Sequence, residues 1–395
     1  MKLSKILATI FLTLSVATSA GCSEDVEQNS NNEGVYLTPS VDKEKSIDRR
    51  VEKIMARMSI QQKVGQMIFV GIHGTEINDN VLHALSHYYP GGIILFDRNL
   101  ESEEQVQRLT SSIQRNSPSK ISLFIGIDEE GGVVSRAPEI IEPPPSQRDL
   151  GRSGDIESAK VWAIKTARRL KELGINVNFA PVLDVGYDVD NDRSNSRKYS
   201  DDPTIVASFA QSAIAGYRQE NFLFTLKHFP GIGRGTVDPH YDLSDIDVSS
   251  AILDSTDVVP FRTVISSRPS EMYFVMISHH KYPSLDPEHP ASVSKTIITD
   301  FLRGSLEFDG VVITDDLEMG SISKTMSFRE AGVQAIQAGA DIAMCCHEYE
   351  HEQEVFNGIF DAVKKGIISE ERIDESVRRI LRAKISANII PEEKE

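Results

Sequence analysis

Ionisable side chains follow five apolar segments of this chain, in each case at the point where the apolar segment ends. They are Asp128, Asp184, Lys227 with His228, His279 with His280, and Asp315 with Asp316. An ionisable group beside a buried strand is costly unless it pairs with or binds something. A helix cap could account for any single one of them. Five in corresponding places indicate one polar site with acid, base and nucleophile chemistry.

The loop 231–240 adds a second chemical feature. It begins Gly-Ile-Gly-Arg-Gly, a composition that permits unusual backbone angles, and it ends Asp238-Pro239-His240. A carboxylate at Asp238 can accept the Nδ1–H of His240, which leaves Nε2 free to transfer a proton near neutral pH. Two alternatives stay open: a surface Asp and His without contact, or a metal site, for which the chain offers no convincing further ligands.

The segments that must position these residues alternate between strand-like and helical patterns. The expected strands are 64–72, 92–96, 123–128, 177–185, 222–229, 273–278, 311–314 and 340–345. Most lack strict alternation of apolar and polar residues, as expected of parallel strands buried on both faces. The clearest expected helices are 47–58, 158–173, 203–219, 328–339 and 370–387. Eight such units predict an α/β fold, a (β/α)8 TIM-type barrel in one domain over residues 46–390, with an open doubly wound sheet as the alternative.

Several of these motifs, taken in order along residues 47–386, resemble glycoside hydrolase family 3 and its bacterial β-N-acetylhexosaminidase branch. The matching segments are Ile127-Asp128-Glu129-Glu130-Gly131-Gly132 with Arg136, Asn178 to Asp184, Arg197 to Pro203, Lys227 to Gly231, Asp238-Pro239-His240, Pro290-Ala291-Ser292 and Ile313 to Met319. The order of the motifs makes the resemblance far more specific than any one of them.

The resemblance implies a retaining hydrolase that removes terminal β-linked N-acetylglucosamine from cell-wall-type glycans, without metal or organic cofactor. Asp315 matches the nucleophile, and Asp316 a supporting or capping group. His240 matches the proton-transfer residue, held by Asp238 on a mobile loop. The positions that bind the hydroxyls of the terminal sugar match Asp128, Arg136, Arg197, Lys227 and His228.

Two features depart from the family pattern or leave a choice. The family loop usually has His where this chain has Ile232, which puts the geometry of the loop in question. Arg193 is a second candidate for the position assigned to Arg197. Alternative functions are a β-glucosidase or β-xylosidase, or a phosphorylase, of the same family. A sugar-binding lipoprotein without turnover is the alternative from another class.

The N-terminus indicates export. Lys2 and Lys5 precede an apolar run over 6–16 and small residues up to Cys22, which predicts a signal peptide over residues 1–21. Ser19-Ala20-Gly21-Cys22 resembles a lipobox, although Leu or Val is more usual than Ser19. We therefore expect a lipid on Cys22 that anchors the exported protein to a bacterial membrane, and a flexible tether over 22–45. Simple cleavage that leaves a free Cys22 is the alternative.

Composition limits the partners. The net charge of −17 argues against nucleic-acid binding, and we expect a monomer whose partner is carbohydrate and whose only membrane contact is the lipid anchor. The remaining cysteines, Cys345 and Cys346, are adjacent, so they predict buried free thiols rather than a disulfide framework or metal ligands.

Overall fold

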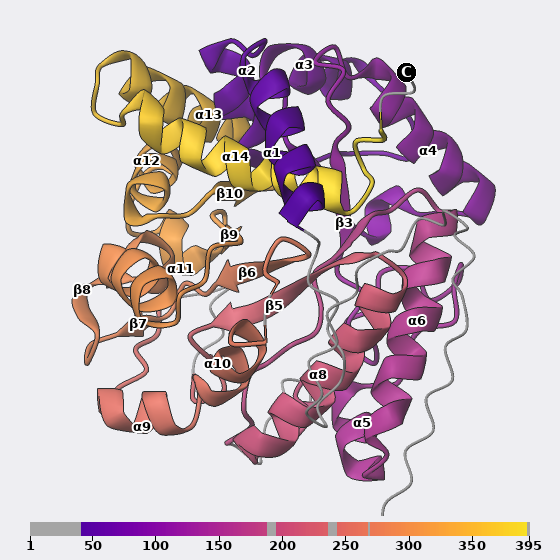
Figure 1. The fold of residues 1–395 in the computed structure, drawn as a ribbon, viewed down its shortest axis with the longest axis vertical. Coiled ribbons are helices and arrows are strands. Elements are labelled where there is room, and N and C mark those ends of the chain that lie inside the picture. The colour runs from indigo at the N-terminus through magenta and orange to yellow at the C-terminus, as the bar shows by residue number, and fades with distance from the viewer. Residues whose placement is uncertain (1–40, 188–194, 236–242, 268, 393–395) are drawn as a thin grey trace, which may run out of the picture. The chain divides into compact units, whose positions relative to one another are not determined.

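The computed structural model describes residues 41–187, 195–235, 243–267 and 269–392. Eight parallel strands form a closed barrel in the order β1-β10-β9-β6-β5-β4-β3-β2 (Figure 1). Their bounds are β1 Ile68–Gly71, β2 Gly92–Leu95, β3 Phe124–Ile127, β4 Val177–Asn178, β5 Leu223–Phe229, β6 Tyr273–Ile277, β9 Val311–Asp316 and β10 Ile342–Cys345. The predicted TIM-type barrel is confirmed. Closure excludes the open sheet, because β1 pairs with both β10 and β2.

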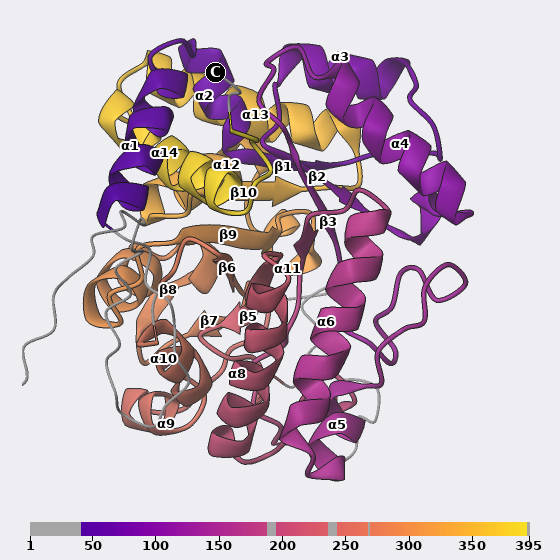
Figure 2. The same cartoon turned by 45° about the vertical axis from the view of Figure 1, so that its right-hand side comes forward.

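Helices follow most strands and surround the barrel. They are α1 Val41–Met55, α2 Ile60–Gln66, α3 Asp79–His87, α4 Glu103–Asn116, α5 Gln147–Ser153, α6 Ile156–Glu172, α8 Pro203–Gln219, α9 Ser250–Ser255, α10 Val259–Ile265, α11 Gly320–Ser323, α12 Phe328–Ala338, α13 Tyr349–Lys364 and α14 Glu370–Ser386. Helices α6 and α8 lie side by side in both ribbon views (Figure 2). The start of α8 agrees with the sequence, since Asp202 caps its first amides and Pro203 occupies its first turn.

Large aromatic side chains pack against strand glycines in the core. The rings of Phe69 and Phe179 meet edge to face with centroids 5.5 Å apart. A β-carbon on Gly92 would lie 2.3 Å from the Phe69 ring, and one on Gly126 would lie 2.7 Å from the Phe179 ring. Glycine at these two strand positions therefore makes room for the rings, which gives the dense packing that the core requires.

Three element boundaries differ from the prediction. Helix α1 already begins at Val41, so residues 41–45 are helical rather than part of the predicted tether; Asp42 and Glu44 in its first turn suit the helix dipole. Residues 64–66 end helix α2 rather than begin a strand. Strand β4 covers only two of the residues in 177–185; beyond it the chain still contacts β5 through separate hydrogen bonds, such as that from the N–H of Leu183 to the carbonyl of Lys227 at 2.6 Å.

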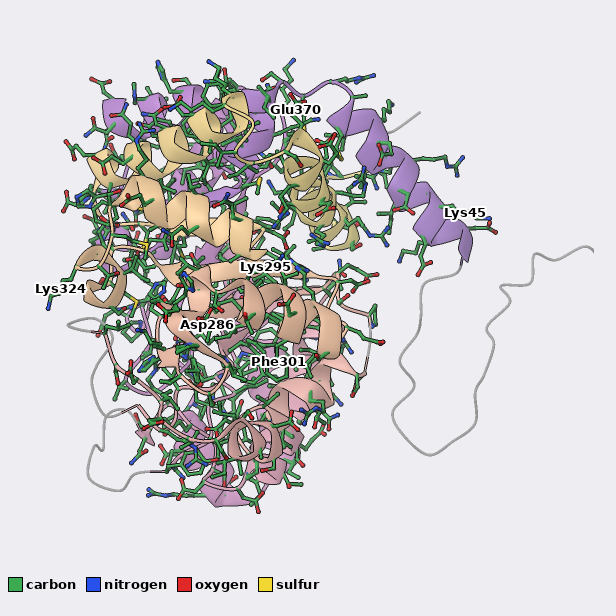
Figure 3. All side chains as sticks on the ribbon, turned by 90° about the vertical axis from the view of Figure 1, so that its left-hand side faces the viewer. Lys45, Asp286, Lys295, Phe301, Lys324 and Glu370 are labelled. Atoms are coloured by element: carbon green, nitrogen blue, oxygen red, sulfur yellow. The ribbon has the colours of Figure 1, made fainter. Side chains whose placement is uncertain are left out.

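The segment between β6 and β9 contains structure that the sequence pattern did not predict. Strands β7 (Lys281–Tyr282) and β8 (Asp286–Pro290) form a two-stranded antiparallel sheet, and a π-helix follows over Thr296–Ser305. Charged side chains occupy exposed positions of the outer layer, such as Lys45 in α1 and Lys324 directly after α11 (Figure 3). Over the part of the chain that the structure describes, no helix is long and apolar enough to cross a membrane. The predicted signal peptide 1–21, and Cys22, lie outside the described residues.

Candidate active site

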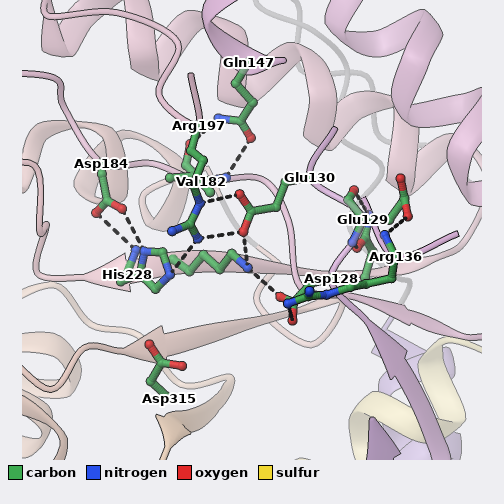
Figure 4. A network of polar contacts seen from close by, with 12 residues as sticks. Asp128, Glu129, Glu130, Arg136, Gln147, Val182, Asp184, Arg197, His228 and Asp315 are labelled. Carbon is green, nitrogen blue, oxygen red and sulfur yellow. Dashed lines mark hydrogen bonds and ion pairs between the residues drawn. The ribbon is translucent and has the colours of Figure 1, made fainter. Parts of the chain in front are cut away.

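Polar side chains from several strand ends converge at one end of the barrel (Figure 4). Asp128 directly follows β3. Lys227 and His228 directly precede the last residue of β5, and Asp315 is the second-last residue of β9. In a parallel barrel the carboxyl ends of the strands share one face, which is where such enzymes build their active sites. The structure thus brings together residues that lie almost 190 positions apart.

Lys227 and Arg197 are held by a shared carboxylate. Nζ of Lys227 lies 2.7 Å from Oδ1 of Asp128 and 2.6 Å from Oε1 of Glu130. The two carboxylate oxygens of Glu130 each accept a hydrogen bond from Arg197, both at 2.8 Å. Burial by itself raises the pKa of Glu130, but the charges of Arg197 and Lys227 outweigh burial and hold that pKa well below its usual range. Glu130 is therefore an anion that fixes both cations.

Asp128 has a second cation nearby. Nη2 of Arg136 lies 3.9 Å from Oδ2 of Asp128, at the outer limit of an ion pair. The carboxylate of Asp128 is 17% exposed, so it is accessible at the edge of the network. A carboxylate of this kind can accept two sugar hydroxyls, and the neighbouring cations can donate to others. The predicted binding residues Asp128, Arg136, Arg197, Lys227 and His228 thus form one cluster.

Asp184 orients His228. Oδ2 of Asp184 lies 2.7 Å from Nδ1 of His228, which directs Nε2 of the ring toward Nη2 of Arg197 at 3.4 Å. Oδ1 of Asp184 accepts the backbone N–H of Ile232 at 2.9 Å. The base of the glycine-rich loop is therefore held through a backbone amide, which any residue except proline offers. This contact keeps the loop base attached despite the departure at Ile232.

Asp315 lies beside this network as a buried anion, and Figure 4 shows its carboxylate directed toward His228. Burial raises its pKa, but the electrostatic influence of the neighbouring His228 and His279 and a hydrogen bond from the backbone N–H of Asp316 (2.9 Å) outweigh burial and lower it below its usual value. Asp315 is therefore ionised at neutral pH, as a carboxylate nucleophile must be. Asp316 instead accepts the N–H of Glu318 through Oδ1 at 3.1 Å, so its carboxylate supports the turn that follows β9.

Two residues of this site were not given their roles by the sequence. Glu130 stands in the acidic run 128–130, and nothing in the run shows which acid faces Lys227 and Arg197. The sequence showed that Asp184 lies at the end of an apolar segment. Its pairing with His228 depends on β4 and β5 being neighbours in the barrel, which the sequence does not show. The predicted Asp238 and His240 lie outside the described residues, as does Arg193. Arg197 contacts Glu130 directly, so it belongs to the charged cluster with Asp128 and Lys227.

A further group of potential ligands lies next to the site. Within the described ranges, Asp316, Cys346 and His347 each place one ligand atom within 4.8 Å of the others. Both ring nitrogens of His347 already have partners: Nε2 lies 3.2 Å from Oδ2 of Asp316, and Nδ1 lies 3.1 Å from Nη1 of Arg98. We therefore interpret the group as a hydrogen-bonded cluster. Cys345 and Cys346 are buried free thiols, as predicted.

A closed parallel barrel with a buried carboxylate and a charged cluster at the carboxyl ends of its strands is the architecture of a TIM-barrel glycoside hydrolase. The domain described as "Glycosyl hydrolase family 3 N terminal domain" matches residues 59–383, and the chain belongs to this family.

Named relatives agree with the predicted branch. The chain is 32% identical over 335 residues to "Beta-hexosaminidase A" of Pseudoalteromonas piscicida, covering 78% of this chain and 56% of that protein. It is 32% identical to "Beta-hexosaminidase LpqI" of Mycobacterium tuberculosis, covering 83% of each. The structure of a family 3 β-N-acetylglucosaminidase from Paenibacillus sp. superposes with a TM-score of 0.82 at 36% identity, covering 86% of this chain and 64% of that one. The chain thus spans less than two thirds of the first and third of these proteins. The predicted resemblance to the β-N-acetylhexosaminidase branch is confirmed.

Proposed function

We propose that the protein is a retaining exo-β-N-acetylglucosaminidase that acts on cell-wall-type glycans. The observation that carries the proposal is the position of anionic Asp315 beside the cluster formed by Asp128, Glu130, Lys227 and Arg197. A terminal sugar whose hydroxyls bind this cluster presents its anomeric carbon to Asp315. The names of the relatives given above support N-acetylglucosamine as that sugar.

The mechanism has two steps. In the first, Asp315 attacks the anomeric carbon, His240 protonates the departing oxygen, and a covalent glycosyl ester forms on Asp315. In the second, His240 accepts a proton from water, and the water displaces the sugar from Asp315. Asp238 stabilises the charged form of His240 in both steps. The chemistry requires no cofactor.

Release of p-nitrophenol from its β-N-acetylglucosaminide tests the proposal. We expect Asp315→Asn to lower kcat by at least about 1,000-fold, since general-base assistance cannot replace a lost nucleophile. The matched control is Asp316→Asn, which changes the adjacent carboxylate and should retain much more activity. A 5-fluoro N-acetylglucosaminyl inactivator should label the peptide that contains Asp315. Unchanged kcat in Asp315→Asn would contradict the assignment.

The same assay separates the alternatives within the family. A preference for the β-glucoside or β-xyloside over the N-acetylglucosaminide would identify one of those enzymes instead. A sugar phosphate as product in phosphate buffer would identify a phosphorylase. Tight binding of N-acetylglucosamine without turnover would identify a sugar-binding lipoprotein.

We also propose that the protein is exported and held at a bacterial membrane through a lipid on Cys22. The support is the sequence pattern that ends at Ser19-Ala20-Gly21-Cys22. Radiolabelled palmitate should label the full chain expressed in a bacterial host and should not label Cys22→Ser. Equal labelling of both would contradict the anchor, and absence of label from both would indicate cleavage without lipidation.

A further inference from the structure

Three consecutive residues after strand β6 contact the loop that leads to Asp238 and His240. We refer to His280, Lys281 and Tyr282 as the 280–282 segment. At the start of the loop, the hydroxyl of Tyr282 donates a hydrogen bond to the carbonyl of Gly231 at 3.0 Å. The imidazole of His280 lies directly against Gly235, because a β-carbon on Gly235 would come within 2.7 Å of Nε2 of His280.

The same segment also holds the chain where it returns. The backbone N–H of Lys281 donates to the carbonyl of Ser244 at 3.1 Å, and the carbonyl of Lys281 accepts the N–H of Ile246 at 2.8 Å. The segment is itself fixed, since the carbonyl of His280 accepts the N–H of Ala291 at 2.9 Å and Tyr282 is fully buried. Residues before and after 236–242 are therefore attached to one rigid support.

His280 is a buried polar residue of the 280–282 segment. It is 1% exposed, and neither ring nitrogen has a hydrogen-bond partner among the residues that the structure describes. Burial lowers the pKa of His280 to about 4, aided by the nearby His228 and His279 and opposed by Asp184 and Asp315. The ring is therefore neutral at neutral pH. Because the described part of the chain offers this buried ring no hydrogen bond, what remains for it is packing, and its contact with Gly235 is of that kind.

We propose that His280 is a positioning residue for the acid/base histidine: its ring supports Gly235 and so fixes the point from which the chain proceeds to Asp238 and His240. The inference rests on the proposed function of His240. Proton transfer depends on placement, and a shift of about 1 Å can cost about 100-fold in rate. The ring lies in the active site, yet its contact is with the backbone of the loop.

The dependence of rate on the leaving group tests this proposal. Protonation by His240 matters for a poor leaving group and hardly at all for a good one. We expect His280→Ala to lower kcat/KM for phenyl β-N-acetylglucosaminide by about 10- to 100-fold. For the 2,4-dinitrophenyl substrate the loss should stay below about threefold. Equal losses of kcat/KM on both substrates would show that the ring contacts the sugar. No loss on either substrate would show that the ring does not affect the reaction. Either result would overturn the proposal.

A double-variant comparison separates this inference from the proposed function. If His280 acts through His240, the variant that carries both His240→Ala and His280→Ala should be no slower with the phenyl substrate than His240→Ala alone. Multiplied losses would overturn the inference and leave the role of His240 intact. A His240→Ala variant whose loss is the same for both leaving groups would overturn the proposed function, and the inference with it.

Gly235→Ala tests the same contact by changing the loop residue instead of His280. The added methyl group would occupy space that Nε2 of His280 fills, so we expect the same selective loss with the phenyl substrate. Gly304→Ala is the matched control, because its methyl group would meet only the carbonyl of Thr299, at 3.4 Å. Thermal unfolding of each variant confirms that it is folded. Full activity of Gly235→Ala with both substrates would overturn the proposal.

Discussion

Glu130 should be a main electrostatic support of the sugar-binding cluster, and Glu130→Gln tests this. The substitution keeps the shape of the side chain and removes its charge. Glu130 is 1% exposed and contacts Arg197 twice and Lys227 once. Lys227 retains Asp128 as a counter-ion, whereas Arg197 loses its charged partner, and the NH2 group of the glutamine replaces one of its two acceptor oxygens with a donor.

The magnitude follows from this geometry. Removing one partner of a buried ion pair costs about 3–5 kcal/mol. The side chain of Arg197 is 26% exposed, and water can solvate part of its freed charge, so we expect the lower end, about 3 kcal/mol. Arg197 and Lys227, which are then held less firmly, should also bind the substrate less well. We therefore expect kcat/KM to fall at least about tenfold, which corresponds to about 1.4 kcal/mol.

Glu129→Gln is the matched control, because it is the same substitution at the adjacent residue. One carboxylate oxygen of Glu129 accepts the backbone N–H of Arg136 at 3.0 Å, and burial raises the pKa of Glu129. A neutral amide can accept the same bond, so its cost should stay within about 1 kcal/mol. Urea unfolding at pH 7 measures both free energies. Equal losses in the two variants, or a loss below about 1 kcal/mol in Glu130→Gln, would refute the reasoning.

Two further predictions concern other buried groups. Burial raises the pKa of Cys345 and Cys346 well above the usual thiol value, so both should react with an aromatic disulfide only after unfolding; fast labelling of the folded protein would contradict their burial. Burial raises the pKa of Asp341, but the charges of Arg303 and its neighbours outweigh burial and lower it. The stability that Asp341 contributes is therefore present above its unfolded pKa near 3.9 and is lost as the pH falls through the lower folded value. Unfolding from pH 5 to pH 3 should be less steeply pH-dependent in Asp341→Asn, and an identical slope would contradict the pairing.

The sequence determined the fold and most of the site because both leave local patterns. Buried parallel strands require apolar runs, and each of the eight predicted runs overlaps a barrel strand. The ionisable residues of the site lie at the ends of these runs, so Asp315 and Lys227 could be selected from their positions and motifs alone. Boundaries such as that of β4 were less accurate, because the apolar run continues beyond the end of the regular strand.

Only the tertiary structure decided which residues pair with which. Closure of the barrel depends on β1 meeting both β10 and β2, and no local pattern records that contact. The position of Glu130 between Arg197 and Lys227 likewise joins segments about 100 positions apart. The sequence records the types of residue that can ionise, but their charges and roles depend on burial and on neighbours that the fold brings close. His280 illustrates this, since its type was visible in the chain, while its burial against Gly235 exists only in the folded protein.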